Sequence, residues 1–233
     1  MVYRRFGKRA LDIVCSAAGI VLLSPLLLAL AVWVKLDSPG PVLFRQKRVG
    51  KGKVLFCILK FRTMYADTPK DVPTHLLQDP DAMITRCGRF LRRTSLDELP
   101  QLFNIFAGQM SVVGPRPALW NQDDLIAERD KYGANALVPG LTGWAQANGR
   151  DELPIPVKAE LDGYYAQNPS FALDVKILFK TARGVWKGDG VVEGGTHGAV
   201  SYTHLTEVSM KNSSLACRTS GAWSSHQGYP VYI

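Results

Sequence analysis

Cysteine and histidine are scarce in this 233-residue sequence, and the few that occur are not grouped. The four cysteines form no CxxC pair, which disfavours a structural zinc site and a disulfide framework and favours a reducing compartment. Three of the four histidines fall after residue 196, so only His75 lies in the body of the chain. Chemistry built on a histidine base, such as a serine triad, is therefore disfavoured.

Acidic residues are also few relative to basic ones. The chain has 28 lysines and arginines against 20 aspartates and glutamates, which gives a formal net charge of +8. A basic balance implies anionic partners, namely nucleic acid, anionic lipid or phosphorylated substrates. The sequence has no helix-turn-helix, zinc finger or basic strand interleaved with aromatic residues, so nucleic acid is not expected as a partner.

One long hydrophobic run stands out. Residues 13–34 carry no charge, and a helix of that length would suffice to cross a bilayer. A secretory signal peptide is one alternative, but no suitable small-residue cleavage site follows the run. Both flanks are basic, and basic flanks favour the cytoplasmic side. We therefore expect residues 1–37 to form a re-entrant membrane helix that breaks at Ser24–Pro25 and returns, with a kinked ordinary span as the alternative.

The remaining pattern predicts a mixed α/β fold that is mostly helical. Two β-prone runs, residues 41–45 and 54–59, flank a turn with two glycines and predict a small β-hairpin. Residues 66–82 are polar and punctuated by proline, so a loop is expected there. Apolar residues then recur at helical spacing. We expect helices at 84–91, from Ser95 to about Gly108, at 121–132 and, as amphipathic interfacial helices, at 156–166 and 171–186.

An acidic pair, Asp97–Glu98, lies at the predicted start of the helix from Ser95. One interpretation is a capping box with Ser95 as the N-cap, and Asp97 as the cap is a variant that brings Pro100 to a harmless position. The other interpretation is catalytic, because a helix start keeps carboxylates ionised and attracts phosphate. One carboxylate could attack phosphorus while the other holds Mg²⁺. Adjacent carboxylates on a helix diverge by about 100°, which disfavours the facing acid and base of a glycosidase.

Arginines surround this pair in the sequence. Arg92 lies five residues before Asp97, and Arg116 lies between two prolines. A rigid backbone presents the Arg116 guanidinium to a phosphate at little entropic cost. A predicted helix face carries three more basic residues: Arg86, Arg89 and Arg93. A basic face against anionic lipid is the alternative role for this face.

Several longer motifs occur in a fixed order. They are KRALD (8–12), SP (24–25), PVLF (41–44), KFRTM (60–64), LRRTSLDELPQL (91–102), QMSVVGPRP (109–117), PGLTGWAQ (139–146), NGR (148–150), LD (161–162) and LDVKIL (173–178). In their order and spacing they resemble the bacterial sugar transferase family, the monotopic phosphoglycosyl transferases. The resemblance covers about residues 3–196, and it also implies a helix that dips into the membrane and turns back.

The resemblance implies a mechanism and a set of site residues. Asp97 matches the nucleophile, which would attack the β-phosphate of a UDP-sugar, release UMP and hold a sugar-1-phosphate covalently until undecaprenyl phosphate takes it. Glu98 matches a catalytic residue and magnesium ligand, so Mg²⁺ is the expected cofactor. Six further residues match substrate-binding positions: Lys60, Arg62, Arg92, Arg116, Arg150 and Asp162.

The resemblance also implies a cellular setting. The reaction would be the first membrane step of bacterial glycoconjugate synthesis (capsule, exopolysaccharide, O-antigen or glycoprotein glycan), at the cytoplasmic face of the inner membrane, and a homodimer is one assembly that it allows. The alternative outside enzymes is a basic adaptor anchored in membrane lipid. An adaptor would explain the charge and the apolar run, but not an Asp–Glu pair beside a rigid arginine.

Three regions are expected along the chain. The membrane-inserted helix at 1–37 precedes a catalytic domain at 38–196, and the resemblance ends there. Residues 197–233 have little helical periodicity and no charge pattern. We expect this tail to be an extension of frame-shift or cloning origin without function, so that truncation after Thr196 leaves activity intact.

Overall fold

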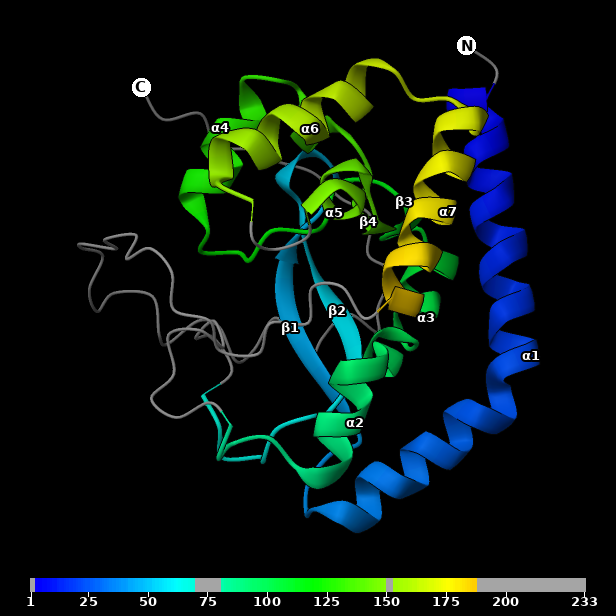
Figure 1. The fold of residues 1–233 in the computed structure, drawn as a ribbon, viewed down its shortest axis with the longest axis vertical. Coiled ribbons are helices and arrows are strands. Elements are labelled where there is room, and N and C mark those ends of the chain that lie inside the picture. The colour runs from blue at the N-terminus through cyan, green and yellow to red at the C-terminus, as the bar shows by residue number, and fades with distance from the viewer. Residues whose placement is uncertain (1–2, 70–80, 150–152, 188–233) are drawn as a thin grey trace, which may run out of the picture. The chain divides into compact units, whose positions relative to one another are not determined.

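The computed structural model describes residues 3–69, 81–149 and 153–187. A π-helical turn at Tyr3–Gly7 leads into the long helix α1 (Lys8–Asp37). Helix α1 lies along one side of the helices and strands that follow it (Figure 1). Within the described residues it is the one helix long and apolar enough to cross a membrane.

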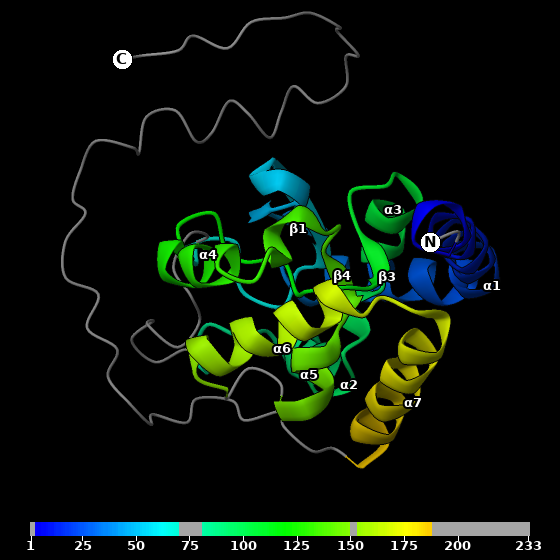
Figure 2. The same cartoon turned by 90° about the horizontal axis from the view of Figure 1, so that it is seen from above.

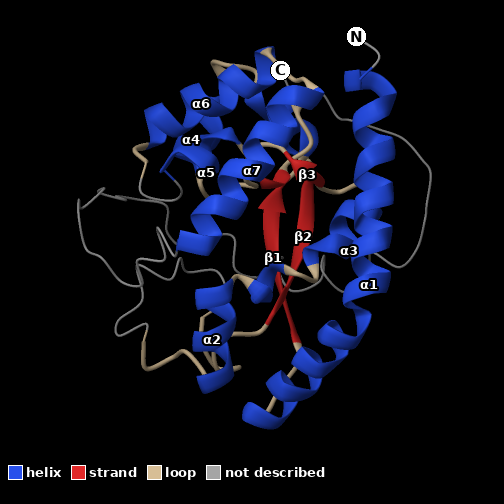
Figure 3. Ribbon diagram, turned by 45° about the vertical axis from the view of Figure 1, so that its right-hand side comes forward, coloured by secondary structure: helices blue, strands red, loops and turns tan. Residues whose placement is uncertain are grey.

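Two small sheets follow α1. Strands β1 (Leu43–Val49) and β2 (Leu55–Phe61) pair antiparallel, from Leu43 opposite Phe61 to Val49 opposite Leu55, and a turn over Lys51–Lys53 joins them. This confirms the predicted hairpin. Strands β3 (Ser111–Val113) and β4 (Gly140–Thr142) pair parallel. Figure 3 shows helices around the strands, so the fold is mixed α/β and mostly helical, as predicted.

The other helices are short. They are α2 (Arg86–Thr94), the 3₁₀ turn η4 (Leu96–Glu98), α3 (Gln101–Phe106), α4 (Asp123–Asp130), the 3₁₀ turn η5 (Ala134–Ala136), α5 (Trp144–Gly149), α6 (Ile155–Gln167) and α7 (Phe171–Lys187). Seen from above, α4 lies on the side opposite α1, and α7 lies near α1 (Figure 2).

Both ends of α1 are bound to the rest of the fold by polar contacts. Near its start, the Asp12 carboxylate accepts bonds from the Ser111 hydroxyl at 3.0 Å and from the Val112 N–H at 2.9 Å. At its end, Asp37 accepts a bond from the Cys87 N–H of α2 at 3.0 Å. Leu30 and Val34 also pack in the core against α2.

Between these ends α1 exposes apolar side chains and changes direction (Figure 1). Leu22 is 77% exposed and Val21 is 70% exposed. Pro25 lies inside the helix and has no N–H to donate to the carbonyl of Val21, four residues earlier. The Ser24 hydroxyl donates to that carbonyl at 2.8 Å. Pro25 therefore bends the helix, and the Ser24 hydroxyl pairs the carbonyl that Pro25 leaves without a donor.

Candidate active site

The acidic pair lies in the single turn η4. Ser95 ends α2 in a left-handed conformation, with φ of 57°, and its side chain makes no capping bond. Helix α3 begins only at Gln101, after Pro100. The expected helix from Ser95, with a capping box, is therefore wrong. The left-handed residue stops α2 and turns the chain, so Asp97 and Glu98 sit between two helices.

Glu98 is held by two cations from distant segments. Its Oε1 atom accepts a bond from Lys60 Nζ of β2 at 2.7 Å and one from Arg116 Nη2 at 3.1 Å. Lys60 Nζ also lies 3.9 Å from Asp97 Oδ2. Lys60 thus bridges both carboxylates, and the structure brings four of the predicted site residues into one cluster.

The pKa values of the two carboxyl groups shift in opposite directions. Burial raises the pKa of Asp97 above its usual range, while the charge of Lys60 opposes the shift and that of Glu98 adds to it. For Glu98 burial acts in the same direction, but the direct contacts of Lys60 and Arg116 outweigh it and hold its pKa well below the usual range. Glu98 is therefore ionised. For Asp97, the balance between burial and the neighbouring cations decides whether the carboxyl group is protonated.

Arg92 borders the same cluster from α2. Its Nε donates to the Thr63 hydroxyl at 3.0 Å, and its charge lowers the pKa of Asp97. Helix α2 can approach this closely because Gly88 lies against the Thr63 backbone, where a side chain would not fit. The other arginines of α2, Arg86, Arg89 and Arg93, are exposed.

A buried ion pair holds the backbone of Arg116. Arg129 of α4 donates through Nη1 to the Arg116 carbonyl at 2.9 Å and through Nε to Asp162 of α6 at 2.8 Å. Asp162 is 1% exposed and Arg129 is 3% exposed. Asp162, predicted as a substrate-binding residue, thus contacts Arg129 and acts on Arg116 through it.

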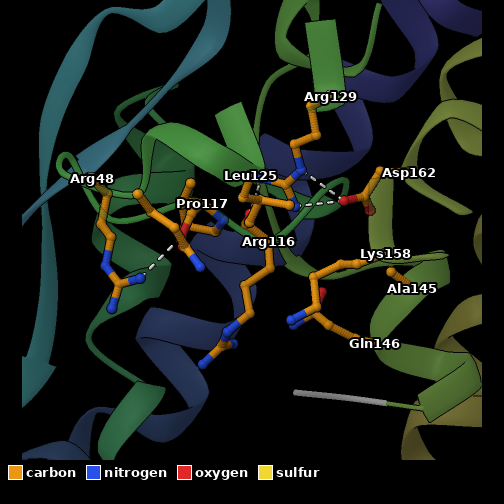
Figure 4. A pocket seen from close by; sticks show the side chains of 11 residues that line it. Arg48, Arg116, Pro117, Leu125, Arg129, Ala145, Gln146, Lys158 and Asp162 are labelled. Carbon is orange, nitrogen blue, oxygen red and sulfur yellow. Dashed lines mark hydrogen bonds and ion pairs between the residues drawn. The ribbon is translucent and has the colours of Figure 1, made fainter. Parts of the chain in front are cut away.

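A pocket opens beside Arg116. Figure 4 shows side chains from β1, the loop after β3, α4, α5 and α6 around it. Its lining residues are Arg48, Arg116, Pro117, Ala118, Gln122, Leu125, Arg129, Ala145, Gln146, Lys158 and Asp162. The lining is rich in cations, and the charge of its one carboxylate is taken by Arg129. Such a pocket suits an anionic ligand with a polar body.

One predicted residue, Arg62, lies outside the acidic cluster. Arg62 is buried, and its guanidinium donates to the carbonyls of Ser38 at 2.8 Å and Pro41 at 2.7 Å, at the end of α1. Arg62 therefore pairs carbonyls at the C-terminal end of that helix and does not belong to the acidic cluster. Arg150 lies outside the described residues, as does the tail at 197–233.

The sequence interpretation missed Arg129 and Thr63. Arg129 occurs in a helix of mixed charge without a clear apolar face, so no local pattern distinguished it from a solvated arginine. Thr63 was noted only as part of the KFRTM motif. Both act through partners distant in the chain, Asp162 and Arg92, which spacing does not reveal.

The cluster contains part of the ligand set that a Mg²⁺ ion would need. Among the residues that the structure describes, no group of three or more His, Cys, Asp and Glu side chains is placed to bind a metal ion. Asp97 and Glu98 supply two carboxylates. Mg²⁺ is usually held by one or two carboxylates plus substrate phosphate oxygens, so this pair fits Mg²⁺ when a phosphate is present.

Comparisons with known proteins show what the chain is similar to in sequence. The family model of the bacterial sugar transferases matches residues 3–188. A UDP-N-acetylgalactosamine-undecaprenyl-phosphate N-acetylgalactosaminephosphotransferase of Aeromonas hydrophila is 43% identical over 193 residues, which cover 79% of this chain and 45% of that protein. A UDP-glucose:undecaprenyl-phosphate glucose-1-phosphate transferase of Escherichia coli K12 is 41% identical over 197 residues, covering 79% of this chain and 40% of that protein.

Those two relatives are longer, and the chain matches less than half of each. A sugar transferase of Bacillus subtilis named EpsL is 38% identical over 202 residues, which cover 87% of this chain and 98% of that protein. The family match extends from the turn before α1 through α7 and includes every element around the acidic cluster. The chain therefore belongs to the bacterial sugar transferase family.

Proposed function

We propose that this protein transfers a sugar-1-phosphate from a UDP-sugar to undecaprenyl phosphate. One observation carries the proposal: a buried Asp97 lies beside an ionised Glu98, within a group of cations, in a fold with a long exposed apolar helix. The names of the two longer relatives state the same type of reaction with two different sugars. The donor sugar is therefore left open.

In the first step an Asp97 carboxylate oxygen attacks the β-phosphorus of the UDP-sugar. A bond forms between this oxygen and phosphorus, and the bond from the β-phosphorus to the bridging oxygen breaks, so UMP leaves with that oxygen. Lys60, Arg92 and Arg116 favour the ionised nucleophile and the charge that develops on the phosphate oxygens. Burial removes water that would compete with the acceptor lipid.

In the second step a phosphate oxygen of undecaprenyl phosphate attacks the same phosphorus. The Asp97 oxygen leaves as a carboxylate, and the product is a lipid-linked diphosphate sugar. The two steps restore the enzyme and need no oxidant or external base, because the lipid phosphate is already an anion. A covalent intermediate also lets UMP leave before the lipid binds.

The metal ligand in this proposal is Glu98, with Asp97 beside it. Mg²⁺ held there would neutralise charge on the diphosphate of the donor. Glu98 Oε1 accepts the bonds of Lys60 and Arg116, while its second oxygen lies outside these two contacts. The cations thus keep Glu98 ionised and orient it.

We further propose that α1 enters the membrane and returns on the cytoplasmic side. A straight helix of 30 residues would extend about 45 Å, enough to place its ends on opposite sides of a bilayer. However, Asp12 near one end and Asp37 at the other both bond to the same folded unit. The bend at Pro25 and the exposed apolar side chains between these contacts support re-entry. The acidic cluster would then lie at the interface, within reach of a soluble nucleotide sugar and a lipid phosphate.

The test is UMP release by detergent-solubilised protein with magnesium, undecaprenyl phosphate and a panel of UDP-sugars. We expect one or a few sugars to give release over many turnovers that depends on the lipid and on Mg²⁺, and chelation by EDTA to stop it. Asp97→Asn should abolish release, because an amide is not a competent nucleophile. Release that is undiminished in Asp97→Asn would contradict the assignment of the nucleophile.

A further inference from the structure

The pocket beside Arg116 contains a hydrogen-bond acceptor without a donor. Gln146 Oε1 is buried, and the described part of the chain offers it no hydrogen-bond partner. The Gln146 amide nitrogen donates to the Leu141 carbonyl at 3.3 Å, which sets the orientation of the amide. Buried acceptors in native proteins almost always have a donor, which makes Gln146 Oε1 a candidate contact for a ligand N–H or O–H.

Arg116 links this pocket to the acidic cluster. It lines the pocket, and its Nη2 also donates to Glu98 Oε1 at 3.1 Å. Arg129 is committed to Asp162 and to the Arg116 carbonyl, so it acts as a support of the pocket wall. A ligand with its phosphates at Arg116 would therefore place its other end against Gln146 and the apolar part of the lining.

The place of the pocket in the fold indicates which end of the donor it holds. The lining comes largely from α4, α5 and α6, and α4 and α6 lie away from α1 (Figures 1 and 2). The proposed reaction divides its donor: the sugar phosphate goes to the lipid, and the nucleotide returns to water. The side away from the membrane helix suits the nucleotide. Pro117, Ala118 and Leu125 offer apolar surface for a flat ring.

We propose that Gln146 accepts a hydrogen bond from N3–H of uracil and so selects uracil over cytosine. Uracil carries a hydrogen at N3, whereas neutral cytosine has a lone pair there. An acceptor fixed in a buried position attracts the first base and repels the second. This assignment rests on the proposed function, because it takes a UDP-sugar as the donor.

Equilibrium binding of nucleotides to the full chain in detergent tests this assignment. Isothermal titration calorimetry would compare UMP with CMP and with N3-methyl-UMP, in which a methyl group replaces the hydrogen. The wild-type protein should prefer UMP over both analogues by about tenfold or more. In Gln146→Met, which has a similar volume and no acceptor, both ratios should fall to near one, mainly through weaker UMP binding.

Two further variants separate hydrogen bonding from general damage to the pocket. Gln146→Glu keeps an acceptor oxygen but loses the donor to the Leu141 carbonyl, so a preference for UMP over N3-methyl-UMP that survives in it comes from the acceptor alone. Gln122→Met removes another amide from the lining, one whose Oε1 already accepts from the Leu119 N–H at 3.4 Å, and should leave the ratios unchanged.

Two outcomes would overturn the inference. One is wild-type protein that binds N3-methyl-UMP as tightly as UMP, a result that does not depend on whether any variant folds. The other is an unchanged preference in Gln146→Met. Either would leave the transferase proposal standing if Asp97-dependent UMP release is observed. Absence of UMP binding to the wild type would overturn the assignment of the pocket, and the release assay would judge the transferase proposal separately.

Discussion

At the scale of single residues, two neighbouring carboxyl groups differ in pKa because their surroundings differ. Glu98 contacts two cations directly and stays ionised, while burial dominates at Asp97 and raises its pKa. Lys60 is the residue that contacts both. Because Asp97 has little water around it, its ionised form depends on the Lys60 ammonium group more than the ionised form of an exposed carboxylate would.

Lys60→Met should therefore shift the acid limb of the pH–rate profile. Asp97 must be ionised to attack, and its raised pKa means that activity rises with pH through a range above that of an ordinary aspartate. Loss of the Lys60 charge raises the pKa of Asp97 further, so the acid limb should move to higher pH. We also expect kcat to fall by about tenfold to a hundredfold. The measurement is UMP release as a function of pH.

The matched control for that substitution is Lys53→Met. Lys53 forms an exposed pair with Asp130 at 2.6 Å, outside the acidic cluster. Its removal should leave the profile in place. An acid limb that does not move in Lys60→Met would show that Asp97 is not the group that limits activity at low pH.

The Arg129–Asp162 pair makes a second prediction at this scale. Removal of one partner leaves a buried charge uncompensated, which typically costs about 3–5 kcal/mol. Arg129→Met and Asp162→Leu should each lower the free energy of unfolding by roughly this amount, and the double variant should lose less than the sum. Chemical denaturation in detergent measures the cycle. An Asp162→Leu variant of unchanged stability and raised KM would indicate direct substrate contact instead.

At the scale of elements, α1 combines two roles. Its ends bond to β3 and α2, and its middle exposes apolar side chains to the surroundings. The bend at Ser24–Pro25 lies between these parts, and the Ser24 hydroxyl pairs the carbonyl that Pro25 leaves without a donor. An unpaired carbonyl in hydrocarbon would be costly, so the two residues work as a unit.

Pro25→Leu should straighten α1 and favour a full span. In the wild type we expect an epitope tag at the N-terminus and one in the Lys51–Lys53 turn both to be protected from protease in intact spheroplasts. In Pro25→Leu the N-terminal tag should become accessible in part of the molecules, because a straight helix is long enough to cross. Ser24→Ala is the control that keeps the bend. An N-terminal tag exposed in the wild type would contradict re-entry.

At the scale of the whole molecule, large apolar side chains are exposed on other elements as well as on α1. Exposed phenylalanines occur on α2, α3 and α7: Phe90, Phe103, Phe106, Phe171 and Phe179. Aromatic and apolar side chains on short amphipathic helices are typical of proteins that lie in the membrane interface. Together with the net charge of +8, they fit contact with an anionic lipid surface.

Phe179→Glu should impair lipid transfer more than covalent labelling. Phe179 of α7 is 71% exposed and lies outside the acidic cluster, so a charge there should disturb contact with lipid and not the attack by Asp97. We expect turnover with undecaprenyl phosphate to slow several-fold while single-turnover labelling with a radioactive UDP-sugar is unchanged. The control is Lys131→Glu, at an exposed site in the turn after α4. Equal loss of both half-reactions would contradict an interfacial role for α7.

Local patterns were enough for much of the fold. Two β-prone runs around two glycines indicated the β1–β2 hairpin, and the uncharged run indicated α1, because both signals arise from neighbours in the chain. The start of α3 was misjudged, since Ser95 adopts a left-handed conformation that its residue type does not announce. For the candidate site, the motif resemblance selected Asp97, Glu98, Lys60 and Arg116, which the structure brings together.

The sequence by itself determined the family, the apolar helix and the identity of the acidic pair, because these reside in residue order and composition. Tertiary structure alone decided that Arg62 donates to carbonyls at the end of α1, that Asp162 contacts Arg129, and that Gln146, in the pocket lining, has a buried acceptor without a donor. Those roles depend on which distant groups meet. Burial makes these meetings decisive, because a charge or an amide that is removed from water needs a partner, and only the fold determines which groups lie near enough to be that partner.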